Sequence, residues 1–338
     1  MAVRCVVAGA GGISNAWFPP LAAEGVEVAA VVDLRPAAAE AQVARYNLTA
    51  EVSDDLRAMI ARHQPDFVLD LTVPEAHHDV TLTALAAGCH VLGEKPLAAT
   101  LAEAREMVAA AAAADRLYMV SQSRRWDTAH ERIRRTVASG RLGQLTTVCC
   151  DFFLGAHFGG FRDAMNSPLI LDMAIHHFDL ARFFTGADPL AVYALEYNPV
   201  GSWYTGAPAA SAIFELSDSL IFTYRGSWCA EGCRTSWNGD WRIIGERGTL
   251  VYAGDTEPWG EVLAPDPGDG FDRRLVPLEV EPAVVEHTTM HGALREMLAF
   301  LAGGPRPATE AADNIHSLAM VFGALDSARR AARVELTV

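Results

Sequence analysis

Apolar residues in the first third of the chain form short continuous runs, separated by segments with helical spacing. The runs cover residues 3–8, 26–32, 67–71, 90–93 and 118–121. Between them, segments such as 37–46, 54–62 and 101–114 place apolar residues three or four positions apart, as in an amphipathic helix. Strands that alternate with helices over short connections predict an α/β fold with a doubly wound parallel sheet, which binds ligands at the carboxyl ends of its strands.

The pattern changes after residue 122. Longer runs rich in Val, Thr, Phe, Trp and Tyr cover 145–153, 190–197, 209–216, 219–229, 237–244 and 249–252. Such runs, joined by short turns, predict a large, open and mostly antiparallel sheet. Helical patterns return at 292–301 and 311–332. We therefore predict a Rossmann domain of residues 1–122 and an α+β domain of residues 123–338.

One predicted helix, over 167–186, interrupts the second set of strands. Ser167 is placed to cap its first N–H groups, and Pro168 suits the first helical position. Gly186 can adopt the left-handed conformation that ends a helix.

This helix carries a candidate proton-transfer pair. Asp172 and His176 are four residues apart, so their side chains would meet on one face of an α-helix. A carboxylate beside an imidazole is a common acid–base arrangement. His177 points about 100° away and is predicted to be structural. Asp179 is predicted to cap or to pair with a neighbour rather than to act in catalysis.

Composition and charge exclude several classes of protein. The chain has 338 residues, 51% of them hydrophobic, and a formal net charge of −15. The negative charge disfavours nucleic-acid binding, and no apolar run approaches membrane-spanning length. The N-terminus leads directly into a strand without signal-peptide features, so we expect a cytoplasmic protein. The six cysteines are expected to be free thiols.

A glycine-rich turn follows the first strand. It reads Gly9-Ala10-Gly11-Gly12-Ile13-Ser14, and the second strand ends in Asp33. A strand, a glycine turn, a helix and a second strand ending in an acid make up a dinucleotide-binding unit, although Ser14 takes the place of the third glycine. Asp33 favours NAD because a carboxylate repels a 2′-phosphate, whereas Arg35 leaves NADP possible.

Further polar residues lie at or just after the predicted strand ends, where the cofactor would bind. The residues expected to contact the cofactor are Gly9, Gly11, Gly12, Ile13, Ser14, Asp33, Arg35, Thr72, Pro74, His77, Glu94, Lys95 and Gln122.

Three blocks together resemble the Gfo/Idh/MocA family of oxidoreductases. They are the glycine turn with Asp33, the segment Gly93-Glu94-Lys95-Pro96-Leu97, and residues 171–179. The resemblance implies a Rossmann domain followed by an α/β domain whose open sheet serves oligomerisation, as a homodimer or homotetramer. It also implies NAD or NADP as cofactor, and sugars, cyclitols or related polyols as substrates.

By this resemblance, Lys95 corresponds to the family's catalytic lysine, which contacts substrate and nicotinamide ribose. Asp172 and His176 correspond to its acid–base pair, with His176 nearest the reacting hydroxyl. The peptide before Pro96 is expected to be strained or cis, as in relatives. No bound metal is expected, since a lysine at the reacting centre argues against an adjacent cation.

A pocket for a polyol usually combines aromatic faces with a few polar groups. On that basis the weaker substrate candidates are His157, Arg162 and Trp237.

These observations predict hydride transfer between nicotinamide and a secondary alcohol. Two alternatives remain open at this point. The first is a lyase or glycosidase that retains NAD and oxidises its substrate only transiently. The second is an NAD-binding regulator without catalysis, against which the complete set of Lys95, Asp172 and His176 argues.

Overall fold

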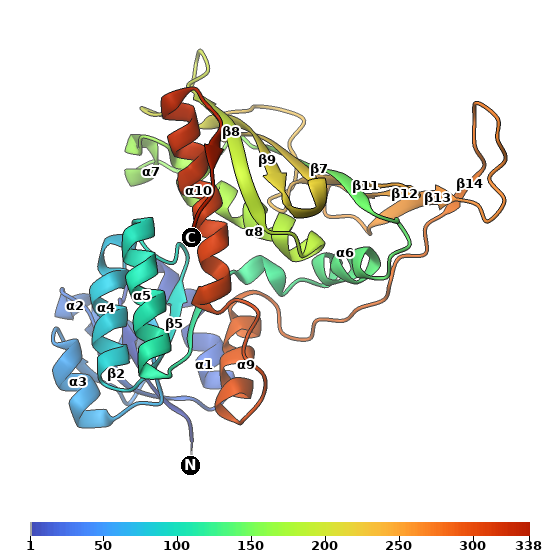
Figure 1. Ribbon diagram of the computed structural model, residues 1–338. Coiled ribbons are helices and arrows are strands. Elements are labelled where there is room, and N and C mark those ends of the chain that lie inside the picture. The colour runs from blue at the N-terminus through green and yellow to red at the C-terminus, as the bar shows by residue number, and fades with distance from the viewer. Residues whose placement is uncertain (1) are drawn as a thin grey trace. The chain divides into compact units, whose positions relative to one another are not determined.

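The computed structural model describes residues 2–338, which form two compact units (Figure 1). The first unit contains the chain up to residue 123 together with 286–318 and 338. The second contains 124–285 and 319–337. The segment 286–318 thus belongs to the first unit, whereas the sequence-based division placed it in the second domain. Long-range packing, which has no local sequence signal, decides this assignment.

The first unit is built around a six-stranded parallel sheet in the order β3-β2-β1-β4-β5-β6, which confirms the doubly wound prediction. Its strands are β1 (Arg4–Ala8), β2 (Glu27–Val32), β3 (Glu51–Ser53), β4 (Phe67–Asp70), β5 (His90–Glu94) and β6 (Tyr118–Ser121). The chain moves outward in one direction from β1 to β3 and in the other from β4 to β6. Such a reversal leaves a ligand crevice at the carboxyl ends of the strands on either side of it.

Helices and burial explain the apolar runs. The helices of this unit are α1 (Phe18–Ala23), α2 (Pro36–Arg45), α3 (Leu56–His63), α4 (Pro74–Ala86), α5 (Leu101–Ala114) and α9 (Thr289–Leu301). Every residue of β4 is buried, as are the last four of β1. Parallel strands covered on both faces need continuous rather than alternating hydrophobicity.

The second unit is a nine-stranded sheet in the order β14-β13-β12-β11-β7-β10-β9-β8-β15. Its strands are β7 (Leu145–Phe153), β8 (Pro189–Tyr197), β9 (Ala209–Leu216), β10 (Ile221–Ser227), β11 (Asp240–Gly245), β12 (Gly248–Tyr252), β13 (Trp259–Leu263), β14 (Leu275–Pro277) and β15 (Val334–Glu335). Only β7 and β10 pair in parallel, so the mostly antiparallel prediction is confirmed. The sequence pattern did not predict β13–β15, which are short strands at the two ends of the sheet order, with β14 and β15 as its edges.

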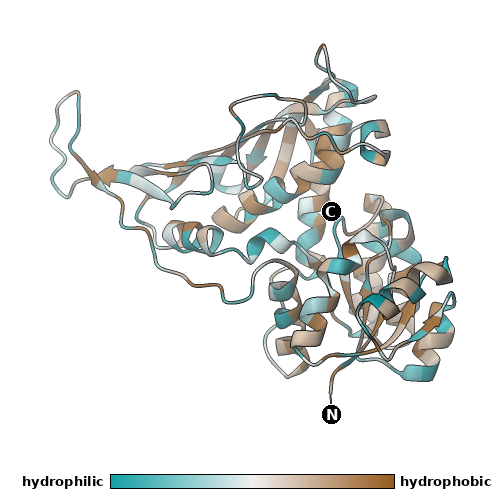
Figure 2. Ribbon diagram, turned by 180° about the vertical axis from the view of Figure 1, so that it is seen from behind, coloured by the Kyte–Doolittle hydropathy of each residue, from teal (hydrophilic) through white to brown (hydrophobic). Residues whose placement is uncertain are grey.

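The helix α8 (Ile175–Thr185) packs on one face of this sheet. The ring of Phe178 lies edge-on to Phe214 at 4.8 Å and to Tyr224 at 5.2 Å. In Figure 2, which views the chain from behind and is coloured by hydropathy, α8 carries hydrophobic residues beside the strands it covers. The helix α6 (Thr128–Ala138) packs against α8, while α10 (Ala311–Arg330) is shared between the units. Among residues 2–338, no helix is long and apolar enough to span a bilayer.

We expect Phe178→Ala to lower the free energy of unfolding by about 3–5 kcal/mol, because it leaves a cavity beneath α8. Urea titration would measure the change. The matched control is Phe271→Ala, whose side chain is fully exposed and which should change stability by less than about 0.5 kcal/mol. Equal effects of both substitutions would contradict the packing described.

Candidate active site

The glycine turn brings β1 into close contact with the end of β4. Gly9 has φ +97°, and a Cβ atom there would lie 2.6 Å from the carbonyl oxygen of Leu71. A side chain at Gly11 or Gly12, in contrast, would have no atom within 4 Å. Gly9 is therefore required by the fold itself, while the other two glycines leave open space in which a pyrophosphate can approach the backbone.

Ser14 fits at the third glycine position because its hydroxyl is used locally. The side chain is fully buried, and Oγ donates a hydrogen bond to the carbonyl of Gly11 at 2.7 Å. The chain forms a short 3₁₀ helix over Gly12–Ala16 before α1 begins at Phe18. The turn therefore keeps its shape without the third glycine.

Asp33, at the end of β2, is held above this turn. Its Oδ2 accepts a hydrogen bond from the N–H of Ala10 at 2.8 Å, and its Oδ1 accepts one from the N–H of Arg35 at 2.9 Å. A carboxylate can accept about four hydrogen bonds, so positions remain for ribose hydroxyls. The Arg35 side chain is 80% exposed, and its Nε lies 3.9 Å from Asp33.

The end of β4 carries a buried carboxyl group that the sequence analysis did not single out. Asp70 Oδ1 accepts hydrogen bonds from the hydroxyl of Thr72 at 2.6 Å and from its N–H at 3.1 Å. Burial raises the pKa of Asp70, and the nearby His77 and the bonds from Thr72 oppose this rise. His77 is itself buried, with its ring nitrogens 2.9 Å from the carbonyl oxygen of Pro96 and 3.2 Å from that of Thr72. This geometry gives His77 a role in holding two strand-end loops together.

At the end of β5, Glu94 is buried and Lys95 is half-buried. Glu94 accepts hydrogen bonds from the indole N–H of Trp17 at 2.8 Å and from the N–H of Lys95 at 3.2 Å. Burial raises the pKa of Glu94, and the bond from Trp17 and the charge of Lys95 counteract it. The Lys95–Pro96 peptide is cis, as the resemblance implied.

The residues present at these strand ends fit a polar cofactor. Gln122 follows β6 and is 1% exposed, yet neither atom of its side-chain amide has a hydrogen-bond partner among the described residues. The same holds for Ser121 Oγ and for Asp70 Oδ2. Buried polar atoms are rarely left unsatisfied in native proteins, so these atoms indicate that a bound polar group completes their hydrogen bonding.

In the second unit, the helix of 168–185 differs from the prediction in its first part. Residues Leu169–Ala174 form a π-helix, and α8 follows from Ile175. A π-helix has a wider i→i+5 turn than the α-helix assumed in the prediction, and four residues make slightly less than one full turn of it. Asp172 lies in the π-helix, with its Oδ2 2.6 Å from Nε of Arg162, and His176 lies half-buried in the first turn of α8. Arg162 therefore joins the predicted pair as a third ionisable group.

The carboxyl end of this helix agrees with the prediction, and its amino end does not. Gly186 adopts φ +69° and donates its N–H to the carbonyl of Arg182, as expected of a helix stop. The expectation for Ser167 was wrong: its hydroxyl bonds to Oε2 of Glu196 at 3.0 Å instead of capping the helix. Burial raises the pKa of Glu196 to about 7, which favours the protonated carboxyl at this contact.

His177 and Asp179 occupy the buried side of α8. His177 is fully buried, with its ring centroid 4.8 Å from that of Phe152. Burial, together with the charge of Arg124, holds the pKa of His177 well below its usual value. Asp179 forms a buried bidentate ion pair with Arg125, with both N–O distances at 2.7 Å. These contacts give both residues structural roles.

The three weaker substrate candidates lie in different environments. His157 stacks on Trp203 at 3.7 Å and pairs with Glu231 at 2.8 Å, while its side chain stays 62% exposed. Trp237 is 46% exposed. Arg162 lies over the ring of Phe161 as well as against Asp172. Lys95 and the cofactor candidates belong to the first unit, whereas Asp172, His176 and these three belong to the second.

Comparison with known proteins agrees with this division. Residues 3–122 match the family described as "Oxidoreductase family, NAD-binding Rossmann fold", and residues 130–251 match "GFO/IDH/MocA C-terminal domain". The chain belongs to the Gfo/Idh/MocA oxidoreductase family. This family is one of oxidoreductases with an NAD-binding Rossmann fold.

Several family members show how far the similarity extends. The chain is 28% identical to the uncharacterised protein y4oX of Sinorhizobium fredii, over 97% of this chain and 94% of that protein. It is 31% identical to 1,5-anhydro-D-fructose reductase of Ensifer adhaerens, over 56% of this chain and 59% of the reductase. Among solved structures, levoglucosan dehydrogenase in complex with NADH and L-sorbose has the same fold, with a TM-score of 0.82 at 19% identity over the full length of both chains.

The open space above the glycine turn leads to a prediction about Gly11, which has φ −72° and therefore accepts a side chain without backbone strain. Gly11→Ala should leave thermal stability nearly unchanged but weaken NAD binding at least about tenfold, because a methyl group would separate the backbone from the pyrophosphate. Calorimetric titration with NAD measures this.

The contrasting variant is Gly9→Ala, which should lower stability because of its contact with Leu71. Unchanged NAD affinity in a folded Gly11→Ala variant would show that the cofactor does not approach this turn.

The raised pKa of Glu196 predicts a pH dependence of stability. The folded state holds its proton more tightly than a group with the usual value of 4.5, so this contribution to stability declines as the pH rises from 4.5 to about 7. Glu196→Gln should remove the decline, and its stability relative to the parent should improve by about 1–2 kcal/mol across this range, allowing for partial exposure. Urea titrations at several pH values, with exposed Glu261→Gln as control, would measure it. Parallel curves for parent and Glu196→Gln would contradict the assignment.

Proposed function

We propose that this chain transfers a hydride between the nicotinamide of NAD and a secondary alcohol carbon of a sugar, cyclitol or related polyol. The observation that carries the proposal is the set of buried, unsatisfied polar atoms at the strand ends of an NAD-binding unit, the same strand ends at which Lys95 follows β5. Relatives named D-glucoside 3-dehydrogenase and inositol 2-dehydrogenase support this class of substrate. NAD, when bound, supplies the hydride acceptor.

The composition of the chain supports a catalytic role for Lys95. Of the 27 basic residues, 26 are arginine, and Lys95 is the single lysine. An ammonium is a compact point charge that can give up its proton, whereas a guanidinium is planar and remains charged. Retention of lysine at this one position favours a role that arginine cannot fill.

Each catalytic candidate has a defined task in this proposal. The Lys95 ammonium stabilises negative charge that develops on the substrate oxygen. His176 accepts the hydroxyl proton as the hydride leaves. Asp172 stabilises the resulting imidazolium, and its ion pair with Arg162 tempers this effect because the guanidinium neutralises part of the carboxylate charge.

Asp33 supports NAD rather than NADP as the cofactor of this reaction. Its carboxylate is fixed by two hydrogen bonds from backbone N–H groups, and the exposed Arg35 side chain lies with its Nε 3.9 Å from this carboxylate. We also propose that the exposed apolar side chains along β8, which include Leu190, Tyr193 and Leu195, contact a second copy of the chain.

The test of the function is to follow NADH formation with NAD and a panel of sugars, cyclitols and sugar acids. Lys95→Ala and Lys95→Arg should both lose at least about a hundredfold in kcat while NAD affinity stays within a few-fold of the parent, because the lost interaction forms mainly in the transition state. A matched control is Arg105→Lys, on the exposed surface of α5.

Full activity of Lys95→Arg would show that only a positive charge is needed. If no substrate yields NADH and tightly bound NAD is recovered from the protein, net hydride transfer is excluded, and the NAD-retaining alternative replaces it.

A further inference from the structure

A second group of ionisable residues lies near the amino ends of the parallel strands, whereas the cofactor turn lies at their carboxyl ends. Glu24 follows α1, which runs antiparallel to the strands, and it precedes the amino end of β2 by three residues. His291 lies in the first turn of α9, and His287 lies just before that helix. All three belong to the first unit. None is among the residues assigned to NAD binding or hydride transfer.

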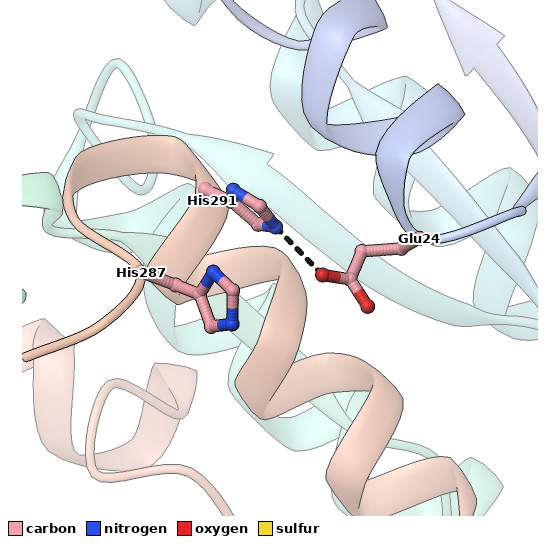
Figure 3. A group of neighbouring side chains, drawn as sticks. All are labelled: Glu24, His287 and His291. Carbon is pink, nitrogen blue, oxygen red and sulfur yellow. Dashed lines mark hydrogen bonds and ion pairs between the residues drawn. The ribbon is translucent and has the colours of Figure 1, made fainter.

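These three residues converge on one space, as Figure 3 shows. One potential ligand atom from each lies within 4.8 Å of the other two. His291 Nε2 is 2.6 Å from Glu24 Oε1, and the two imidazole rings are 4.2 Å apart between centroids. The side chains of Glu24 and His291 are 13% and 28% exposed, so the space is sheltered but open to solvent.

Arg295 orients the carboxylate of this group. Its guanidinium donates a hydrogen bond to Glu24 Oε2 at 2.8 Å, which leaves Oε1 directed toward His291. The hydrogen bonds from His291 and Arg295 lower the pKa of Glu24. An outer residue that fixes a carboxylate ligand in this way is a regular feature of metal sites.

We propose that Glu24, His287 and His291 bind a divalent transition metal, with Zn²⁺ the preferred ion. Two imidazoles and one carboxylate are ligands that Zn²⁺ favours, while Mg²⁺ and Ca²⁺ prefer sets made only of oxygen. A tetrahedral zinc ion needs its ligand atoms about 3.3–3.5 Å apart. The Glu24–His291 contact of 2.6 Å must therefore open by less than about 1 Å, and the other separations, which are at most 4.8 Å, must close by up to about 1.5 Å.

Positive charge around these three residues limits their affinity for a metal ion. The guanidinium of Arg295 and the positive end of the α9 dipole both disfavour an added dication. We therefore expect a dissociation constant of about 1–100 μM, with water completing the coordination shell. Bound metal would tie the end of α1 to the start of α9, which returns to the first unit from far along the chain. The consequence is stabilisation of the first unit rather than catalysis.

The experiment is titration of the chelator-treated, full-length protein with Zn²⁺ by calorimetry and with Co²⁺ by visible absorption. The parent should bind one equivalent of Zn²⁺, and a saturating concentration should raise Tm by a few degrees. His287→Asn, His291→Asn and Glu24→Gln should each weaken binding at least about tenfold. The absorption of bound Co²⁺ should lack the strong charge-transfer band that a thiolate ligand such as the exposed Cys233 would give.

His78→Asn is the matched control. His78 also faces a glutamate, Glu106, at 2.9 Å, but within residues 2–338 it is not part of a group of three possible ligands, so His78→Asn should leave Zn²⁺ binding unchanged. NAD binding by each variant, which should stay at the level of the parent, reports that the first unit is folded. Absence of saturable binding by the parent, or parent-like affinity in folded His287→Asn and His291→Asn variants, would overturn the proposal. Either result leaves the proposed hydride transfer untouched.

Discussion

The contact between Gly9 and the carbonyl of Leu71 determines the geometry of the first unit. It forces the turn after β1 against the chain that leaves β4, at the point where the strand order reverses. The middle of the sheet is formed mainly by buried apolar side chains, such as Val7, Val68 and Leu92. Polar chemistry can therefore gather only where the strands end, and the glycine turn, Asp33, Asp70, Glu94 and Gln122 all lie there.

Burial sorts similar residues into different roles in the second unit. His176 and His177 are neighbours in sequence, but His176 is half-buried, whereas His177 is fully buried among aromatic rings, where desolvation favours the neutral imidazole. Burial distinguishes Asp172 from Asp179 in the same way. Asp179 is neutralised by a bidentate arginine in the interior, and Asp172 pairs with Arg162 at a partly exposed position. The buried side of this helical segment therefore packs on the sheet, while the partly exposed side carries the groups proposed for catalysis.

The charged neighbours of the proposed catalytic groups differ between the two units. In the first unit, the single lysine follows a buried glutamate whose pKa burial raises, so the two groups influence each other in a region of low dielectric. In the second unit, a guanidinium lies against the carboxylate that would support the imidazole. The Glu24 cluster repeats this arrangement, since Arg295 occupies one oxygen and leaves the other directed toward a histidine.

The sequence alone determined the parts of this protein that depend on local pattern. Continuous apolar runs, the glycine turn with Asp33 and the Glu94-Lys95-Pro96 segment were sufficient to predict the parallel sheet, the NAD cofactor and the family. Only the tertiary structure decided where residues 286–318 belong, that Ser167 bonds to Glu196, and that Asp172 lies in a π-helix beside Arg162. It alone brought Glu24 next to His287 and His291. The physical reason is that hydrophobic periodicity reports which face of a segment is buried, whereas ion pairs and ligand sets depend on which distant segments the packing brings together.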